Sequence, residues 1–237
     1  MGSWLQPVEE AVEAAREPVR VFFRDDDAGW DDARLLALLD RFAACGQPVD
    51  LAVIPRSLGA GLAGELAARP GVGLHQHGLA HANHEREGRK CEFGPSRGLE
   101  AQRRDIEAGR DRLADLLGDR VDPIFTPPWN RCTADTGTAL AELGFRVLSR
   151  ESRAEPLAVP GLSELPVHID WVRLSPLELG TGIAAAIEAG GPVGLMFHHA
   201  VMDDGDMRRM SELLGLLAGH ERVRAERMLE LARASVV

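Results

Sequence analysis

Short apolar runs alternate with amphipathic segments along most of the chain. Seven apolar runs have the length of strands: residues 19–24, 49–54, 72–75, 123–126, 146–149, 165–170 and 193–197. Five other segments carry apolar residues at helical spacing: residues 32–44, 99–117, 134–143, 176–189 and 211–218. Strands that alternate with helices predict a parallel sheet with crossover helices, which is an α/β fold.

Local signals mark the ends of several predicted helices. The segment Ser175-Pro176-Leu177-Glu178 has the pattern of a capping box with proline at the first helical position. Gly144 and Gly190 directly follow two of the helical segments, where glycine commonly ends a helix.

The order of elements is compatible with a (β/α) barrel or with an open doubly wound sheet. About seven strand–helix units could close into a barrel. No Gly-x-Gly-x-x-Gly pattern follows the first strand, which argues against a dinucleotide site. With 237 residues, no repeat and no linker-like segment, we expect residues 1–237 to form a single domain. In both architectures, chemistry is expected at the carboxyl ends of the strands.

Composition and charge narrow the classes of function. The net charge of −10 disfavours nucleic acid and anionic membranes as partners. No apolar run is long enough to cross a bilayer, so no membrane span is expected. The first twenty residues carry four glutamates and lack the basic-then-apolar order of a secretion signal, which predicts a cytoplasmic protein. The three cysteines show no paired spacing, so neither a disulfide framework nor a zinc knuckle is predicted.

Three consecutive aspartates, Asp25, Asp26 and Asp27, stand at the end of the first predicted strand. Adjacent carboxylates repel one another, so a metal ion or a cation such as Arg24 should compensate. An acidic loop that caps the next helix is the simpler alternative. Asp31 fits that alternative better, because it directly precedes the helical segment.

Histidines are concentrated after the third predicted strand, where residues 75–84 contain four of the eight in the chain. His77 and His81 are four residues apart and would share one face of a helical turn. That spacing allows two imidazoles to reach one metal ion. A surface cluster, or core histidines bonded to backbone, is the alternative.

Two further segments carry candidate chemistry. Pro127 and Pro128 stiffen a turn and would hold Trp129 as a platform for a sugar ring, although a rigid turn with a core tryptophan is the simpler interpretation. His198 and His199 end the last apolar run, and one of them could serve as a general acid. A structural histidine at a strand end is equally compatible with this pattern.

A histidine and an aspartate also alternate in one predicted strand. His168 and Asp170 would face the same side of it. Asp170 could therefore orient a histidine, and a satisfied polar strand end is the alternative.

Taken in order, these segments resemble the polysaccharide deacetylase family, the NodB-homology group of metal-dependent carbohydrate esterases. The resemblance runs from about Val19 to His199. It implies a distorted (β/α) barrel of about seven parallel strands with outer helices. The family motif Thr-Phe-Asp-Asp-Gly overlays residues 24–28 and implies Asp26 as general base and Asp27 as metal ligand, whereas a shift by one residue gives Asp25 and Asp26. The His-x-x-x-His motif implies His77 and His81 as the other two ligands.

The remaining motifs show departures from the family pattern. The third motif, Arg-x-Pro before an aromatic residue and Gly, corresponds to Thr126-Pro127-Pro128-Trp129-Asn130, so the arginine that holds the base is missing and Arg24 or Arg131 could replace it. The last motif, Leu-x-His, matches Met196-Phe197-His198 and implies His198 as the catalytic histidine, with His199 as the next candidate. The implied substrate contacts are Arg24, Pro128, Trp129, Asn130, Arg131 and His199.

The resemblance implies a hydrolase of non-peptide carbon–nitrogen bonds that removes an acyl group, such as acetyl, from an amino sugar or glycan. The implied cofactor is one divalent metal ion, with zinc first and Co(II), Ni(II) or Fe(II) also suited to the ligand set. Two alternatives stay open: a hydrolase of a cyclic ureide or formamide on the same scaffold, and a non-catalytic protein that binds carbohydrate or metal.

Overall fold

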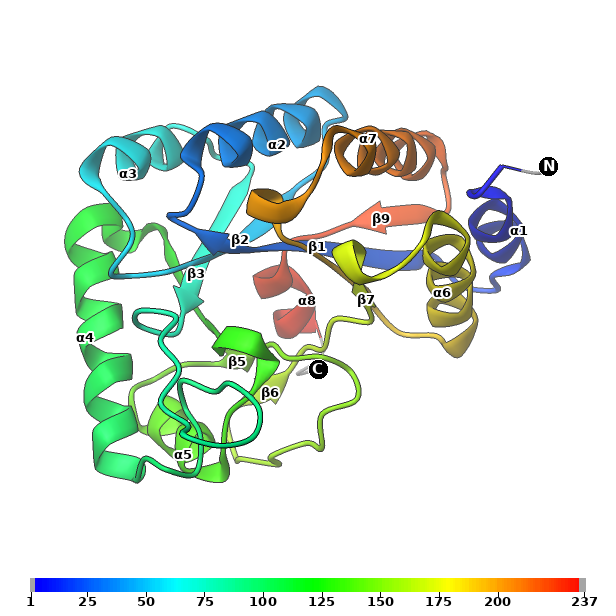
Figure 1. The fold of residues 1–237 in the computed structure, drawn as a ribbon. Helices are drawn as coiled ribbons and strands as arrows, with labels where there is room; N and C mark the ends of the chain where they lie inside the picture. The colour runs from blue at the N-terminus through cyan, green and yellow to red at the C-terminus, as the bar shows by residue number, and fades with distance from the viewer. Residues whose placement is uncertain (1–2, 235–237) are drawn as a thin grey trace.

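A curled sheet of parallel strands forms the centre of the molecule (Figure 1). The computed structural model describes residues 3–234. The strands follow the spatial order β6-β5-β4-β3-β2-β1-β8-β7, and β9 pairs with the start of β1. Their bounds are β1 Val19–Ala28, β2 Val49–Val53, β3 Val72–His77, β4 Val121–Thr126, β5 Val147–Leu148, β6 Ser163–Glu164, β7 Ile169–Asp170, β8 Val193–Phe197 and β9 Val223–Ala225.

Helices surround this sheet, with α2, α3 and α7 along one side and α4 along another (Figure 1). Their bounds are α1 Gln6–Ala14, α2 Asp32–Ala44, α3 Ala60–Ala67, α4 Leu99–Leu117, α5 Ala134–Glu142, α6 Pro176–Ala189, α7 Asp204–Gly219 and α8 Met228–Ala234. Within residues 3–234, none of the helices combines the length and apolar character that crossing a membrane requires.

The predicted barrel-type α/β fold is confirmed, and the open doubly wound alternative is not observed. Within residues 3–234 the sheet has nine strands, compared with the prediction of about seven. Its two ends, β6 and β7, are linked by a short segment in which Val167 exchanges backbone hydrogen bonds with Arg150 and Ser152. The barrel is therefore curled and incompletely hydrogen-bonded, as a distorted barrel should be.

Strand β1 lies at the middle of the sheet and is buried along nearly its whole length. It pairs in parallel with β2, β8 and β9. Phe22 packs into one apolar cluster and Phe23 into another, because successive side chains of a strand point to opposite faces. A strand held on both edges and both faces gives the acidic residues at its carboxyl end a rigid base.

A buried ionic cluster connects the start of α8 with strands β2 and β4. Asp50 of β2 accepts a hydrogen bond of 2.9 Å from the Met228 backbone N–H. Its other oxygen lies 3.3 Å from Nε of Arg227, which also pairs with Asp122. A Cβ atom at Gly73 would lie 1.9 Å from the Asp50 carboxylate, so glycine is required there. Burial raises the pKa of Asp50 to about 6, despite the opposing effects of the Met228 N–H and Arg227.

We expect Asp50→Asn to change how stability depends on pH. The pKa of the native Asp50 lies above that of an unfolded aspartate, so its ionisation penalises the folded state as the pH rises from about 4 to about 6. Asparagine removes that penalty. The free energy of unfolding of the variant, relative to wild type, should rise by roughly 2–3 kcal/mol between pH 4 and pH 7. Urea titrations across this range measure it.

The control for this experiment is Asp115→Asn, which changes an exposed aspartate on α4. Its stability relative to wild type should show no comparable slope. A flat difference curve for Asp50→Asn would mean that Asp50 titrates as an ordinary carboxylate in the folded protein.

Candidate active site and metal centre

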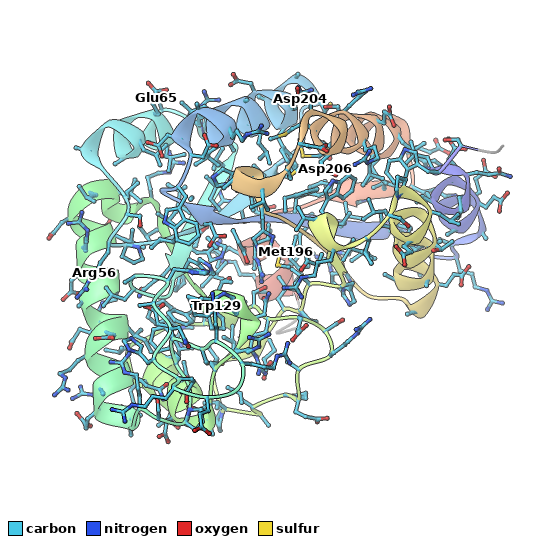
Figure 2. All side chains as sticks on the ribbon, in the orientation of Figure 1. Arg56, Glu65, Trp129, Met196, Asp204 and Asp206 are labelled. Atoms are coloured by element: carbon cyan, nitrogen blue, oxygen red, sulfur yellow. The ribbon has the colours of Figure 1, made fainter. Side chains whose placement is uncertain are left out.

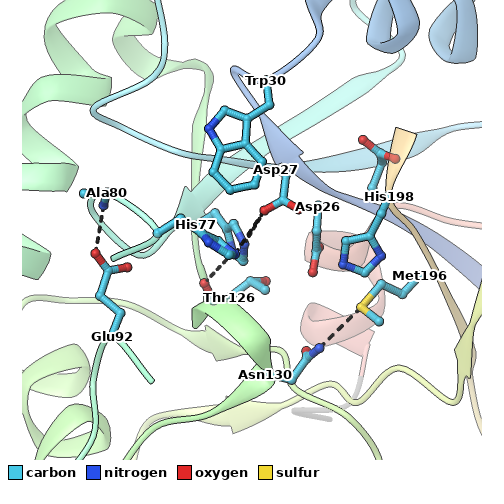
Figure 3. A network of polar contacts seen from close by, with 12 residues as sticks. Asp26, Asp27, Trp30, His77, Ala80, Glu92, Thr126, Asn130, Met196 and His198 are labelled. Carbon is cyan, nitrogen blue, oxygen red and sulfur yellow. Dashed lines mark hydrogen bonds and ion pairs between the residues drawn. The ribbon is translucent and has the colours of Figure 1, made fainter. Parts of the chain in front are cut away.

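Three potential metal ligands converge at the carboxyl ends of β1 and β3 (Figure 3). Asp27 lies near the end of β1, His77 ends β3, and His81 lies in the loop that follows. Oδ1 of Asp27 is 3.2 Å from Nε2 of His77 and 3.2 Å from Nε2 of His81. The three candidate ligand atoms all lie within 4.8 Å of one another.

The orientation of His77 and the neutral state of His81 suit metal binding. Nδ1 of His77 lies 3.0 Å from the Thr126 carbonyl and donates to it, so Nε2 faces Asp27. Burial alone would lower the pKa of His77, but the Asp27 carboxylate, 3.2 Å away, and the charge of Asp26 outweigh it and raise that pKa. Burial, followed by the charge of His77, lowers the pKa of His81 to about 4, which leaves that imidazole neutral at pH 7.

The Asp27 carboxylate fits a metal ion better than a structural role. Its Oδ1 atom is buried and has no hydrogen-bond partner among the described residues. An orphaned carboxylate oxygen between two imidazole nitrogens is the donor set expected of a site for a first-row divalent ion. Burial raises the pKa of Asp27, but the adjacent histidines lower it by more, so the carboxylate is ionised and available.

The backbone is strained at this site. Positive φ angles are uncommon for residues other than glycine, and they concentrate at functional sites. Four of the six such residues in the described part of the chain lie here: Asp27, His81, Trp129 and Asn130. The fold therefore holds two of the candidate ligands and the turn opposite them in conformations that an ordinary loop would avoid.

A buried glutamate supports the loop that carries His81. Glu92 accepts hydrogen bonds from the backbone N–H groups of Leu79, at 3.3 Å, and Ala80, at 2.9 Å (Figure 3). It is only 1% exposed, and a Cβ atom at Gly78 would lie 2.1 Å from its carboxylate. Glu92 thus fixes the path between the two histidines. Its role could not be predicted from the motif, because it is distant from His77 in sequence.

We expect Glu92→Ala to weaken metal binding by roughly 10- to 100-fold, the effect typical of losing a residue that orients metal ligands. The variant leaves two buried N–H groups without an acceptor and frees His81 to move. Titration calorimetry with Zn²⁺ measures the affinity. Glu87→Ala, an exposed change in the same loop, is the control. Equal affinity of Glu92→Ala and wild type would show that the loop holds its shape without Glu92.

The second feature of the site is a buried ion pair between Asp26 and Arg24. Nε and Nη2 of Arg24 lie 2.7 and 2.9 Å from the two oxygens of Asp26. Arg24 is also hydrogen-bonded to Ser149 and Asn130 and contacts the Met196 sulfur. Burial raises the pKa of Asp26, but Arg24, His77 and His198 more than compensate and lower it to about 2. Asp26 is therefore ionised at neutral pH.

Arg24 makes the contact with Asp26 that the resemblance expects from the missing arginine of the third motif. It reaches Asp26 from two residues earlier on the same strand. Arg131, the other residue considered for this role, instead donates to the Lys90 carbonyl at 2.8 Å.

His198 follows β8 and lies on the opposite side of Asp26 from Asp27 (Figure 3). Its side chain is 22% exposed, and its Nδ1 atom is 3.9 Å from Oδ1 of Asp170. Burial raises the pKa of Asp170, while His198 and Arg173 oppose that shift. The histidine that lies beside Asp170 is therefore His198. His168 instead accepts a hydrogen bond from the Gly194 N–H.

His199 and Asp25 form a separate, fully buried pair. The Asp25 carboxylate is 2.5 Å from Nδ1 of His199 and also accepts its backbone N–H. Nε2 of His199 lies 2.6 Å from the Trp30 carbonyl. Burial opposes protonation, but Asp25 and these hydrogen bonds raise the pKa of His199 to about 9. This pairing leaves Asp26 and Asp27, rather than Asp25 and Asp26, facing the histidine loop.

Three of the predicted substrate contacts are not compatible with the structure. Arg24 and His199 are buried, and their polar atoms are engaged by protein groups. Pro128 is also buried, close to Gly78, and shapes the turn instead. Trp129, Asn130 and Arg131 are partly exposed and border a cavity beside the site.

Two indoles flank His81. The ring of Trp129 is 4.3 Å from the His81 ring, and that of Trp30 is 4.8 Å away on an otherwise exposed loop. Trp30 is 39% exposed, so part of its ring faces solvent. Figure 2 shows Trp129 near the middle of the molecule, among the surrounding helices. Trp30 was missed because a lone tryptophan after an acidic cluster carries no distinctive sequence signal.

No protein-family model and no curated protein matches the sequence. Several solved structures nevertheless share its fold. A protein from Mycobacterium smegmatis assigned to the polysaccharide deacetylases has a TM-score of 0.76 at 17% identity and covers 93% of this chain and 92% of its own. An acetyl xylan esterase of carbohydrate esterase family 4 from Clostridium thermocellum, in complex with a cobalt ion, has a TM-score of 0.61 at 13% identity, with 92% of both chains covered.

A family 4 pseudoenzyme from Bacillus anthracis also matches, with a TM-score of 0.62 at 11% identity and coverage of 92% of this chain and 66% of its own. Fold and catalytic activity are therefore separable among these neighbours. The resemblance noted in the motifs extends to the whole architecture, and this chain has the NodB-type barrel fold of the polysaccharide deacetylases and family 4 carbohydrate esterases.

Proposed function

We propose that the protein is a metal-dependent hydrolase that removes an acyl group from the nitrogen of an amino sugar. The observation that carries the proposal is the adjacency of two sets of groups. One set, Asp27, His77 and His81, would hold the metal ion. The other is the Asp26 carboxylate, which directly precedes Asp27 on the same strand. An ion pair with Arg24 holds this carboxylate in place.

The three ligands would leave coordination positions open for solvent and substrate. A divalent ion, when bound there, lowers the pKa of a coordinated water toward neutrality and polarises the acyl carbonyl. Zinc is our first choice, and the cobalt ion in one structural neighbour supports a site of this class.

Asp26 acts as the general base. With a pKa of about 2 it is fully ionised, and Arg24 fixes its orientation through two hydrogen bonds. It takes a proton from the attacking water as the carbon–oxygen bond forms. A carboxylate this weakly basic needs a water that has already been acidified, which is why its position beside the metal ligands matters.

His198 acts as the general acid. It lies across Asp26 from the ligand triad and is partly open to solvent. The nitrogen of the scissile bond leaves poorly as an anion, so it needs a proton as the carbon–nitrogen bond breaks. Asp170, 3.9 Å away, is placed to orient the imidazole.

The two indoles support a sugar as the substrate. The apolar rings of Trp30 and Trp129 both pack against His81. Aromatic faces next to a polar reaction centre suit the mixed apolar and hydroxyl surface of a pyranose.

Metal analysis and a substrate screen together test the proposal. We expect about one ion per chain in wild type and none in a His77→Ala/His81→Ala double variant. The zinc-loaded protein should release acetate from N-acetylhexosamines, and the double variant should not. Cyclic ureides and formamido sugars are screened in parallel, and turnover of those alone would assign the same site to the alternative hydrolase class. Binding of N-acetylhexosamines without turnover by the metal-loaded protein would contradict the hydrolase proposal and support a binding protein.

A further inference from the structure

A small cavity opens beside the proposed reaction centre. Its volume is about 200 Å³. Trp129, Asn130, Asp170 and Met196 are among the residues that line it. Trp129 touches His81, Asn130 bonds to Arg24, and Asp170 faces His198, so the cavity and the site share side chains. The volume lies below the roughly 300–1,000 Å³ of sites that take a whole drug-sized ligand, so the cavity suits one part of a substrate.

The cavity is lined by an excess of positive charge. Four arginines contribute to it: Arg89, Arg131, Arg153 and Arg173. Two carboxylates, Glu151 and Asp170, also line it, so four positive and two negative charges leave a net charge of +2. The whole chain has a net charge of −10. A basic cavity in an acidic protein is a local feature that its overall composition does not predict.

Only part of this positive charge is neutralised by the protein. Arg173 pairs with Asp170 at 2.8 Å. Arg131 donates one hydrogen bond to a backbone carbonyl, and its Nε atom is buried without a partner among residues 3–234. Burial, and then the positive charge of Arg89, lowers the pKa of Arg131, so these guanidinium groups lie close enough to repel one another. Arg89 and Arg153 have no ion pair with any described residue.

We propose that this cavity binds an anionic group of the acylated substrate, so that the enzyme acts on a sugar carrying a phosphate or a carboxylate. The proposal rests on the proposed function, because it concerns the substrate of that same site. Guanidinium groups bind both anions with paired, charge-assisted hydrogen bonds. A neutral glycan would leave the repulsion between Arg89 and Arg131 unrelieved and would give Arg89 and Arg153 no counter-ion. An anion would relieve that repulsion and place the rest of the sugar toward Trp129 and the reaction centre.

The kinetic test compares three substrates of the zinc-loaded protein: N-acetylglucosamine, its 6-phosphate, and N-acetylmuramic acid, which carries a carboxylate. We expect kcat/KM for at least one anionic substrate to exceed that for the neutral sugar by tenfold or more. The preferred anion identifies the phosphate or the carboxylate as the recognised group. Arg89→Ala/Arg153→Ala should abolish the preference, and the control Arg104→Ala/Arg208→Ala, which changes exposed arginines on α4 and α7, should retain it.

A binding test separates this proposal from the proposed function. Inorganic phosphate and acetate are titrated into the full-length His77→Ala/His81→Ala variant, which cannot hold them through a metal. Binding of either anion that Arg89→Ala/Arg153→Ala weakens by tenfold or more supports the cavity as the site. If no sugar is turned over but this binding is present, the hydrolase proposal fails and the anion site stands. No binding, together with equal kcat/KM for neutral and anionic sugars, would overturn the anion site and leave the hydrolase proposal intact.

Discussion

Asp26→Asn should lower turnover by roughly 100- to 10,000-fold, the range that a general acid or base contributes. Asparagine has nearly the same shape as aspartate and keeps an acceptor for Arg24, but it cannot take a proton from water. The proposed metal ligands Asp27, His77 and His81 are unchanged, so the variant should still hold about one ion per chain. Steady-state rates of acetate release and metal content, measured on the same preparation, check both expectations.

Asp25→Asn is the matched control, because it changes the neighbouring carboxylate without touching the proposed base. Asp25 is bonded to His199 and is buried beneath the site. This variant should lose stability, because a protonated His199 would be left buried with a neutral partner. Its turnover should fall less than that of Asp26→Asn. A larger loss in Asp25→Asn than in Asp26→Asn would restore the alternative register, in which Asp25 is the base.

The fold could be predicted where the hydrophobic pattern is long and periodic. The bounds of α2, α4 and α6 agree with the predicted segments, and each has several turns that bury one face. Short elements gave no such signal. Helix α3 has eight residues, and strands β6 and β9 have two and three, so tertiary pairing rather than local pattern determines them. Helix α7 begins at Asp204, earlier than predicted, because the Asp203 capping box precedes its apolar face.

The candidate site could be predicted only where the functional residues lie in local motifs. His77 and His81 are four residues apart, and Asp27 follows a strong strand, so their type and spacing were visible in the sequence. Glu92 and Ser149 reach the site through long-range packing, and no spacing rule indicates them. The arginines around the cavity come from four separate segments, so their shared location depends on the folded chain.

Arg24 of β1 joins several segments of the candidate site through its buried guanidinium group. It pairs with Asp26 on the same strand. Two further contacts come from other segments. Asn130 of the third-motif segment turns its side-chain oxygen to Arg24, at 2.8 Å, and Met196 places its sulfur against the same guanidinium. These contacts link three motif segments through one buried cation.

Arg24→Met should therefore destabilise the protein strongly, by roughly 3–5 kcal/mol, because it leaves a buried carboxylate without its main partner. Without Arg24, burial should raise the pKa of Asp26 above its ordinary value, so this loss should shrink as the pH falls and Asp26 takes up a proton. Urea unfolding at pH 7 and pH 5 measures both effects. A loss below about 1 kcal/mol at pH 7 would mean that water reaches Asp26 or that the histidines suffice to stabilise its charge.

The double variant Arg24→Met/Asp26→Asn separates the ion pair from simple packing. If Arg24→Met loses stability because Asp26 is left as an unpaired charge, removing that charge should recover part of the lost free energy of unfolding. The coupling energy between the two positions should then be roughly 0.5–3 kcal/mol. If the loss comes from lost packing and from the broken bonds to Ser149 and Asn130, the two single effects should add. Coupling would show that Arg24 is retained in the interior because Asp26 must be a carboxylate there. Stability alone does not explain this requirement, because apolar residues fill such a space at least as well. The proposed role of Asp26 as a base beside the metal ligands does explain it.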